Sequence, residues 1–360
     1  MIRFENVTKY HKGKKAPAVT ALNLDIREGE LCVLIGPSGC GKTSILKMIN
    51  RLDLQDEGTI SVDGSDIGET DVVSLRRRIG FMMQNAALFP HRTVEANIAA
   101  VPHLLKWDKE KTRRRVVELM DLVGLPPELA GRYPSQLSGG QQSRVALARA
   151  LASDPPVILM DEPFSALDPL IRERLQDELV SLQKRLHKTI VLVTHDMEEA
   201  IKLADRIAVF EEEGKLVQFD TPKNILAYPA SPFVQQFVGN DPSLKRLALM
   251  KVSELEEPDS AAPRLDSAAE TRLAHVSPAL KLVLNDQHQP ISWLSDSHHP
   301  APRLTLVSGT ESLHHALLKI LSTPSGVIVQ VDDDGKYTRC ISTSHLYDAL
   351  HDPQREVVND

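Results

Sequence analysis

Short runs of apolar residues, each followed at once by polar residues, recur through the first two thirds of the chain. The runs at 31–35, 157–160 and 190–193 are rich in Val, Ile and Leu. Strands buried on both faces of a parallel sheet have this composition, and ligands of open α/β sheets gather at their carboxyl ends. Residues 1–6 alternate between apolar and polar side chains, which predicts an edge strand. The pattern predicts an α/β domain over residues 1–240 with a largely parallel sheet.

Segments of helical periodicity separate these runs. Apolar residues recur at three- and four-residue intervals in 43–52, 111–122 and 140–151, which places them on one face of a helix. Helical patterns predominate between residues 92 and 149, so we expect a helical subdomain to interrupt the sheet. Every apolar run is shorter than the roughly 18 residues that a membrane-spanning helix needs. The first residues have no signal-peptide pattern.

The last third of the chain, residues 241–360, differs from the rest. It carries 11 basic and 17 acidic residues, against 31 and 32 in residues 1–240, so it supplies most of the net charge of −7. Two weakly similar halves, 241–302 and 303–360, each contain a predicted strand, an acidic turn and a second strand. The sequence thus predicts a small α+β tail built from a degenerate repeat, after a boundary near 239–242.

Composition limits the possible functions. The acidic balance argues against broad nucleic-acid binding, because such binding needs a basic surface that displaces counterions from phosphates. We interpret the three arginines at 76–78 as a solvated cluster at a helix end rather than a nucleic-acid site. The cysteines Cys32, Cys40 and Cys340 are too few and too scattered for a disulfide framework or a zinc site. Their number favours a reducing compartment.

Residues 36–43 match the phosphate-binding pattern of glycine, four residues, glycine, lysine and serine or threonine. Glycines in such a loop let backbone N–H groups approach phosphate oxygens, aided by the positive end of the following helix. We expect Lys42 to neutralise the β- and γ-phosphates of ATP and the Thr43 hydroxyl to bind Mg²⁺. The alternative is a glycine turn with a solvated lysine. The residues expected to contact the nucleotide here are Gly36, Pro37, Ser38, Gly39, Cys40, Gly41, Lys42, Thr43 and Ser44.

Two adjacent carboxylates follow the apolar run 157–160. We expect Asp161 to hold the same Mg²⁺ ion through water, because it lies at the end of a buried strand. Glu162 follows directly and can orient and deprotonate a water in line with the γ-phosphate, which makes it the predicted general base. The alternative is that Glu162 only caps a helix before Pro163.

The segment Leu-Ser-Gly-Gly-Gln at 137–141 lies between these two motifs. The three motifs in this order resemble the ATP-binding subunit of ABC transporters, a resemblance that covers residues 1–240. It implies a P-loop ABC-type nucleotide-binding domain and two chains that close head-to-tail over two ATP molecules. Glutamine is common in this family where Ser143 stands, and this departure should tune rather than abolish function. The residues implied to contact the γ-phosphate bound to the opposite subunit are Ser138, Gly139, Gly140 and Gln141.

Further residues match the same family. Gln84 matches the loop glutamine that contacts Mg²⁺ and faces the membrane subunit, and His195 matches the switch histidine near the γ-phosphate. Residues 165–168 match the dimer-contact loop. Tyr10 is expected to stack on adenine. Each has a structural alternative, such as Tyr10 covering the edge of a sheet.

Two segments, 47–52 and 88–94, resemble the subunits that energise uptake of quaternary amines such as glycine betaine, choline and carnitine. The tail resembles a degenerate pair of CBS modules, which many members of that group carry. The resemblance implies a peripheral homodimer on the cytoplasmic side of the inner membrane, bound to integral membrane permease subunits. A quaternary ammonium group needs an aromatic cage, and two Trp and five Tyr spread along the chain would not build one. We therefore expect a separate substrate-binding protein.

Two alternatives stay open. The same ATPase can serve import of another small solute. The chain can also be a soluble ABC ATPase of DNA repair or translation, but such proteins usually carry two nucleotide domains, coiled-coil or zinc insertions, or a basic surface. This chain has one complete motif set and an acidic tail.

Overall fold

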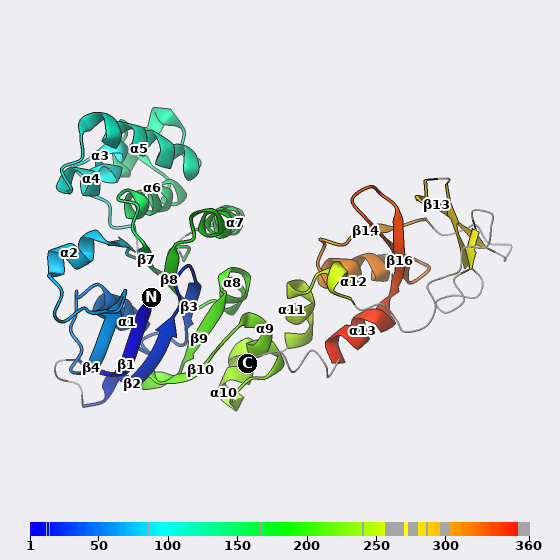
Figure 1. The fold of residues 1–360 in the computed structure, drawn as a ribbon, viewed down its shortest axis with the longest axis horizontal. Coiled ribbons are helices and arrows are strands. Elements are labelled where there is room, and N and C mark those ends of the chain that lie inside the picture. Colours follow the sequence, from blue (N-terminus) through cyan, green and yellow to red (C-terminus); the bar gives the residue numbers. More distant parts are fainter. Residues whose placement is uncertain are drawn as a thin grey trace. The chain divides into compact units, whose positions relative to one another are not determined.

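The computed structural model of the chain forms two compact units, Met1–Val238 (unit 1) and Gly239–Asp360 (unit 2) (Figure 1). The structure describes residues 1–11, 13, 15–84, 86–165, 167–239, 241–255, 270–272, 280–285, 287–295 and 303–351.

Unit 1 contains two β-sheets. The smaller sheet is antiparallel, with strand order β2-β1-β4-β5, and the larger has the order β10-β9-β3-β8-β7-β6. Its strands are parallel except for the β9–β10 pair. The strands of the smaller sheet are β1 (Ile2–Tyr10), β2 (Pro17–Ile26), β4 (Glu57–Val62) and β5 (Ser65–Asp66). Those of the larger sheet are β3 (Leu31–Ile35), β6 (Ile79–Met82), β7 (Val157–Asp161), β8 (Thr189–Thr194), β9 (Arg206–Phe210) and β10 (Leu216–Asp220).

The prediction that the chain starts with an edge strand is wrong. Strand β1 lies inside its sheet and pairs with β2 on one side and β4 on the other. Alternation of apolar and polar residues reports that one face of a strand is covered, and it carries no information about hydrogen bonding along the two sides. Both partners of β1 come later in the chain, so residues 1–6 alone could not reveal them.

Helix α1 (Lys42–Ile49) forms the centre of the unit 1 core. Its apolar side chains belong to one buried cluster that includes Phe4 and Ile60 of the antiparallel sheet and Leu34 and Leu159 of the parallel sheet. The helix ends three residues earlier than the sequence predicted, because Asn50 caps it and Arg51 adopts a left-handed conformation with φ of 48°. The phosphate-binding loop, which precedes α1, therefore lies against both sheets: Gly41 is next to Ala18 of β2, and Gly36 is next to Phe210 of β9.

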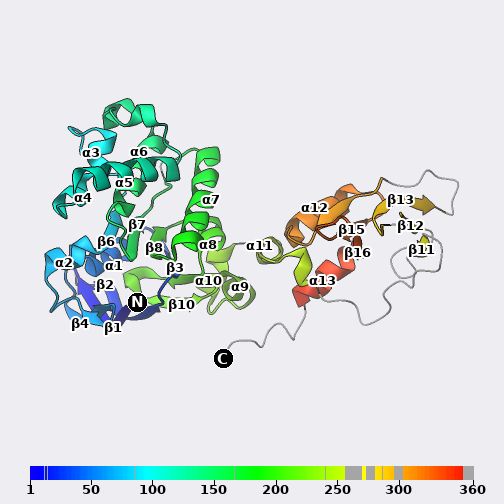
Figure 2. The same cartoon turned by 45° about the horizontal axis from the view of Figure 1, so that its top comes forward.

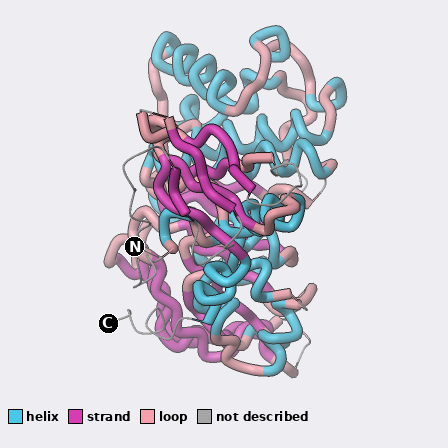
Figure 3. The backbone as a smooth tube through the Cα atoms, turned by 90° about the vertical axis from the view of Figure 1, so that its right-hand side faces the viewer, coloured by secondary structure: helices cyan, strands magenta, loops and turns pink. Residues whose placement is uncertain are grey.

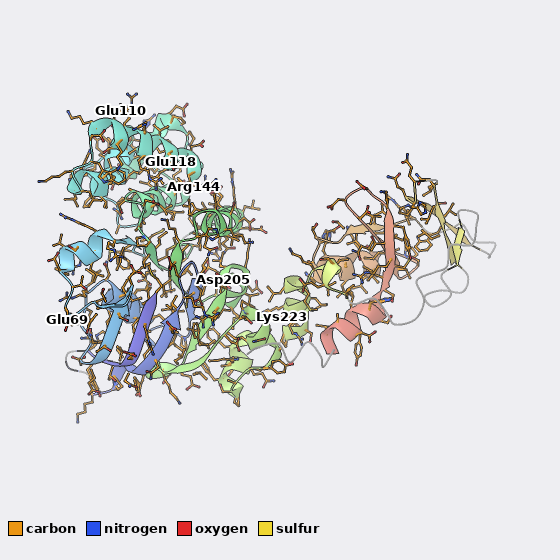
Figure 4. All side chains as sticks on the ribbon, viewed as in Figure 1. Glu69, Glu110, Glu118, Arg144, Asp205 and Lys223 are labelled. Carbon is orange, nitrogen blue, oxygen red and sulfur yellow. The ribbon has the colours of Figure 1, made fainter. Side chains whose placement is uncertain are left out.

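A helical insert joins β6 to β7, as the sequence predicted, and it is the part of unit 1 that lies uppermost in Figure 3. Arg144, which Figure 4 labels on this insert, donates from Nη1 to the Gly124 carbonyl oxygen at 3.0 Å. The helices of the insert are α3 (Val94–Ile98), α4 (Ala100–Leu104), α5 (Lys109–Leu122) and α6 (Gly139–Leu151). The remaining helices of unit 1 are α2 (Val72–Arg77), α7 (Pro169–Leu186), α8 (Met197–Leu203), α9 (Pro222–Ala227) and α10 (Pro232–Val238).

The carboxyl ends of the parallel strands coincide at one edge of the sheet. Ile35 pairs with Thr194, and Asp161 pairs with Val193. Helix α8 packs on β3 and β8 (Figure 2). Asp205, which follows α8 and is labelled in Figure 4, accepts a hydrogen bond from the backbone nitrogen of Leu31 at 2.8 Å. The polar residues that follow each apolar run therefore meet at this edge.

Unit 2 contains two three-stranded sheets, β11-β12-β13 and β14-β15-β16. Alternate residues of β15 face different layers: Ile328 packs with the helices, whereas Val327 and Val329 pack with Trp293 of β13. Each sheet contains an antiparallel hairpin, β12–β13 and β15–β16. The elements are α11 (Pro242–Leu249), β11 (Glu270–Arg272), β12 (Leu280–Leu284), β13 (Pro290–Ser295), β14 (Leu306–Ser308), α12 (Leu313–Ser322), β15 (Val327–Val331), β16 (Tyr337–Ser342) and α13 (Thr343–His351).

Candidate functional site

The phosphate-binding loop connects β3 to α1. A Cβ atom on Gly36 would overlap the Phe210 carbonyl oxygen, and one on Gly41 would overlap the carbonyl oxygen of Ala18. The protein's own backbone thus requires glycine at these two positions. Gly39 has open space around it and a φ of +82°, which glycine adopts without strain. Gly41 caps α1 without a side-chain hydrogen bond, so the loop presents backbone N–H groups of the first helical turn to an anion.

Lys42 is folded back onto the loop. Its Nζ donates to the carbonyl oxygens of Gly36 and Pro37, both at 2.8 Å, and lies 3.5 Å from the Cys40 sulfur. The side chain is only 6% exposed. The predicted contact of Lys42 with the β- and γ-phosphates stays a prediction, and no sequence pattern indicated that backbone carbonyls hold this cation.

Asp161 and Thr43 come together although 118 positions separate them in the chain. Asp161 ends β7, and its Oδ1 accepts a hydrogen bond from the Thr43 hydroxyl at 3.1 Å. Burial raises the pKa of Asp161, and the Thr43 hydrogen bond opposes that shift. Two side-chain oxygen atoms, of the type that Mg²⁺ prefers, therefore lie side by side.

Glu162 lies between two polar side chains from different elements. Its Oε2 accepts from Gln84 Nε2 at 3.1 Å, and its Oε1 lies 3.2 Å from His195 Nδ1. The backbone nitrogen of Glu162 donates to the Val193 carbonyl oxygen at 3.0 Å. Its φ of 46° is unusual for a residue other than glycine. Such strain persists where the surroundings over-determine a conformation, which is common at functional sites.

The alternative that Glu162 only caps a helix is wrong. The next helix, α7, begins at Pro169, and Asp168 caps it by accepting a hydrogen bond from the Ile171 nitrogen at 3.1 Å. Ser165 Oγ instead bonds back to the Glu162 carbonyl oxygen at 3.0 Å. The predicted dimer-contact segment thus joins the Glu162 turn directly to α7; its residue Ala166 lies outside the described residues.

The predicted signature residues form the start of α6. Ser138 caps this helix: its hydroxyl accepts from the Gln141 nitrogen at 3.2 Å, and Gln141 Oε1 accepts from the Ser138 nitrogen at 2.9 Å. Gly140 is tightly packed, because a Cβ atom there would lie 3.1 Å from Ile171 Cγ2. None of the hydrogen bonds recorded within the described part of the chain joins residues 138–141 to the phosphate-binding loop.

The strand end at Tyr10 lies beside α1. Tyr10 is 42% exposed, and its nitrogen donates to Asp56 Oδ2 at 2.7 Å. His11 follows, and its Nε2 lies 3.2 Å from the hydroxyl of Ser44. His11 is not among the predicted site residues, and its position next to Tyr10 is the signal in the sequence that could have indicated it. Lys12 and Lys14 lie outside the described residues.

The remaining sequence predictions concern basic and sulfur groups. The arginines at 76–78 are exposed at the end of α2, as predicted, and the Arg76 guanidinium also donates to the carbonyl oxygens of Asn50 and Arg51. Arg78 pairs with Asp63. The three cysteines are free and buried. Within the described residues, no group of three or more His, Cys, Asp or Glu side chains is arranged to hold a metal ion.

The β3–loop–α1 unit, the paired carboxylates at the end of β7 and the helical insert that carries 138–141 together define an ABC-type nucleotide-binding domain. A sequence model of the family described as ABC transporter matches residues 19–165. Among the described residues, the helices lack the combination of length and apolar character that crossing a bilayer requires.

Three relatives extend this result. The osmoprotectant import ATP-binding protein OsmV of Salmonella typhimurium is 41% identical over 97% of this chain and 96% of its own. The glycine betaine/carnitine/choline transport ATP-binding protein OpuCA of Bacillus subtilis is 54% identical over 67% of this chain and 63% of its own. The dimeric bacterial ABC transporter cassette MJ0796 is 37% identical, with a TM-score of 0.57 over 62% of this chain and 99% of that one. The chain belongs to the ABC transporter family, as an ATP-binding subunit with ATPase activity.

Proposed function

We propose that Glu162 is the general base of ATP hydrolysis in this chain. The observation that carries this assignment is the placement of the Glu162 carboxylate between Gln84 and His195, one residue after Asp161. In this proposal a Glu162 oxygen takes a proton from the water that attacks the γ-phosphate, while His195 and Gln84 hold the carboxylate in place. ADP and inorganic phosphate are the products.

Thr43, Gln84 and Asp161 are the proposed Mg²⁺ ligands. The Thr43 hydroxyl and the Asp161 carboxylate, which are 3.1 Å apart, are oxygen donors suited to this ion. When bound, Mg²⁺ would neutralise phosphate charge and offset the cost of burying an ionised Asp161. Lys42 would exchange its bonds to Gly36 and Pro37 for the β- and γ-phosphates.

Residues 36–41 and Ser44 of the phosphate-binding loop, with Tyr10 beside adenine, complete the proposed ATP site. The proposed functional unit is a head-to-tail homodimer in which residues 138–141 of one chain cover ATP bound to the other. Two observations support it: residues 138–141 and the phosphate-binding loop share no recorded hydrogen bond within the described part of the chain, and the related cassette MJ0796 is described as dimeric.

A mixing experiment tests the shared site. We expect Lys42→Ala to weaken ATP binding at least about 10-fold, because a phosphate-binding cation is lost, and both Lys42→Ala and Ser138→Arg homodimers to lack turnover. A heterodimer of the two variants keeps one site with both residues intact and should hydrolyse ATP. A heterodimer as inactive as both parents would contradict the shared site.

The proposed transport function is import of quaternary-amine osmoprotectants such as glycine betaine, choline or carnitine. The names of the osmoprotectant relatives support it, as do segments 47–52 and 88–94. The chain would bind integral membrane permease subunits on the cytoplasmic side of the inner membrane, and a separate protein would bind the solute. A strain lacking this chain should lose uptake of labelled glycine betaine, and plasmid-borne wild type but not Glu162→Gln should restore it.

A second candidate solute class has one specific observation in its favour. A sulfate/thiosulfate import ATP-binding protein of Chromobacterium violaceum is 48% identical over 66% of this chain. The similarity to OsmV extends over 97% of the chain and so includes the tail, which favours the osmoprotectant class. If unlabelled sulfate competes with the uptake of labelled glycine betaine and unlabelled choline and carnitine do not, the sulfate class would be favoured over the osmoprotectant class.

For the tail we propose two degenerate CBS-like modules, 241–302 and 303–360, after a nucleotide-binding domain at 1–240. The two antiparallel hairpins, β12–β13 and β15–β16, support a repeat. Their packing into one apolar cluster that contains Leu282, Trp293 and Val329 supports a single folded body. Its proposed role is regulation of transport.

A further inference from the structure

A buried carboxylate lies close to the site and outside the predicted motifs. Glu199 of α8 is 7% exposed. Its Oε2 accepts a hydrogen bond from the Thr194 hydroxyl, and its Oε1 accepts one from Gln176 Nε2 at 3.2 Å. Thr194 and Gln176 are 2% and 6% exposed. Three buried polar groups from β8, α7 and α8 therefore satisfy one another, an arrangement that is costly to disrupt because a buried group left without a partner is strongly disfavoured.

Thr194 holds the backbone on both sides of His195. It is the last residue of β8, and its hydroxyl also accepts from the Asp196 nitrogen at 3.1 Å. The His195 side chain is 58% exposed and lies 3.2 Å from Glu162. Packing contributes little to the position of a side chain that is mostly in solvent, so the His195 ring depends on its contact with Glu162 and on the backbone that Thr194 anchors.

The hydrogen-bonded group of Glu199, Thr194 and Gln176 is also connected, through α7, to the segment at 165–168. Gln176 lies on this helix, which begins after Asp168. Arg172 makes a second connection: its Nη2 donates to the Leu167 carbonyl oxygen at 3.2 Å, and its Nη1 lies 3.9 Å from Asp196 Oδ2. Helix α7 is therefore connected to the segment around His195 at two positions: the buried Gln176, through Glu199, and the more exposed Arg172, through Asp196.

We propose that Glu199 is a positioning residue for hydrolysis: through Thr194 it fixes the backbone that carries His195, and through Gln176 it couples that backbone to α7. The inference rests on the function proposed above, since it assigns importance to where His195 lies relative to Glu162. A shift of α7 on contact with a second subunit would then be transmitted to His195.

Thr194→Val tests the proposal, because valine keeps the shape of threonine and removes the hydroxyl. We expect kcat to fall about 10- to 10²-fold, the size of effect that a misplaced catalytic group produces, with KM for ATP within about twofold of wild type. Thr194→Ser restores the hydroxyl and should restore kcat to within about threefold. The matched control is Thr189→Val at the other end of β8: Thr189 is 1% exposed and accepts from the Gly29 nitrogen at 3.0 Å.

Thr189→Val should lower the melting temperature about as much as Thr194→Val and leave kcat within about twofold. Equal kcat values for the two variants would overturn the proposal. Combination with His195→Ala supplies the second test: if Thr194 acts through His195, Thr194→Val should lower kcat by less than twofold further in that background. Independent, multiplicative losses would overturn the proposal while leaving the ATPase site intact. Wild-type turnover in both Glu162→Gln and His195→Ala would overturn the site itself and the inference with it.

Discussion

Units 1 and 2 both bury polar side chains, but they place them differently. In unit 1, Lys42, Asp161 and Thr194 are each less than 10% exposed and lie at the carboxyl edge of the parallel sheet. Directly beside them, Glu162 and His195 face solvent to a larger extent. Desolvated charges next to accessible acid–base groups are the arrangement that catalysis needs.

Unit 2 uses its buried polar groups to hold its own elements together. Gln330 of β15 accepts from Arg339 Nε at 2.6 Å, and the same guanidinium donates to the carbonyl oxygens of Val252 and Leu255. The Thr323 hydroxyl donates to Thr305 at 3.1 Å. The comparison teaches that buried polarity alone does not identify a site. Lys42, Asp161 and Thr194 converge on an accessible edge, whereas Gln330 and Thr323 of unit 2, like Thr189 at the other end of β8, only connect elements of their own unit.

The largest effect on ATP hydrolysis is expected from a substitution that removes the proposed general base of unit 1 and keeps the shape of the side chain. Glu162→Gln should slow ATP hydrolysis about 10²- to 10⁴-fold, the usual contribution of a general base, and should leave ATP affinity within about threefold. The variant should also accumulate as an ATP-bound dimer, because closure is completed but hydrolysis is not. Steady-state phosphate release and size-exclusion chromatography with ATP measure the two results.

Glu198→Gln is the matched control for this substitution. Glu198 is an exposed residue in the first turn of α8, so the same chemical change there should leave turnover within about twofold. Turnover of Glu162→Gln within a factor of three of wild type would remove Glu162 from the role of general base.

Sequence could predict the groups of unit 1 that touch the proposed nucleotide, because they lie in local patterns. Gly36 and Lys42 follow the buried strand β3 closely, Asp161 is the last residue of β7, and parallel strands bring such ends together. The Glu199 contact with Gln176 spans 23 positions and two helices. Neither residue differs from an ordinary polar position on an amphipathic helix, so pattern alone could not pair them.

The second prediction tests whether unit 2 can be destabilised without a loss of ATP turnover in unit 1. Ile328 is fully buried among the helices of unit 2. Ile328→Ala should lower the free energy of unfolding of that unit by about 2–5 kcal/mol, through lost burial and a residual cavity, and leave ATP turnover within about twofold. The chain has two tryptophans, so Trp107→Phe leaves Trp293, buried in unit 2, as the reporter of its urea unfolding.

Ile291→Ala is the control for the Ile328 experiment. Ile291 is 58% exposed on β13, and its truncation should change the unfolding free energy of unit 2 by less than about 0.5 kcal/mol. A parallel fall in ATP turnover with Ile328→Ala alone would show that unit 2 stability is required for catalysis, contrary to the comparison.

The smallest expected effect on chemistry comes from removing unit 2 altogether. A fragment of residues 1–240 keeps every proposed catalytic residue and 31 basic against 32 acidic residues, so it should fold and hydrolyse ATP within about twofold of the full chain. The tail has 11 basic and 17 acidic residues, and repulsion between paired tails would be screened as salt rises, since the Debye length is roughly 8 Å near 0.15 M. Uptake by the assembled transporter should therefore respond to osmotic strength in the full chain and respond less in the truncated one. Superimposable uptake curves would exclude the tail as the sensor and leave unit 2 with a structural role only.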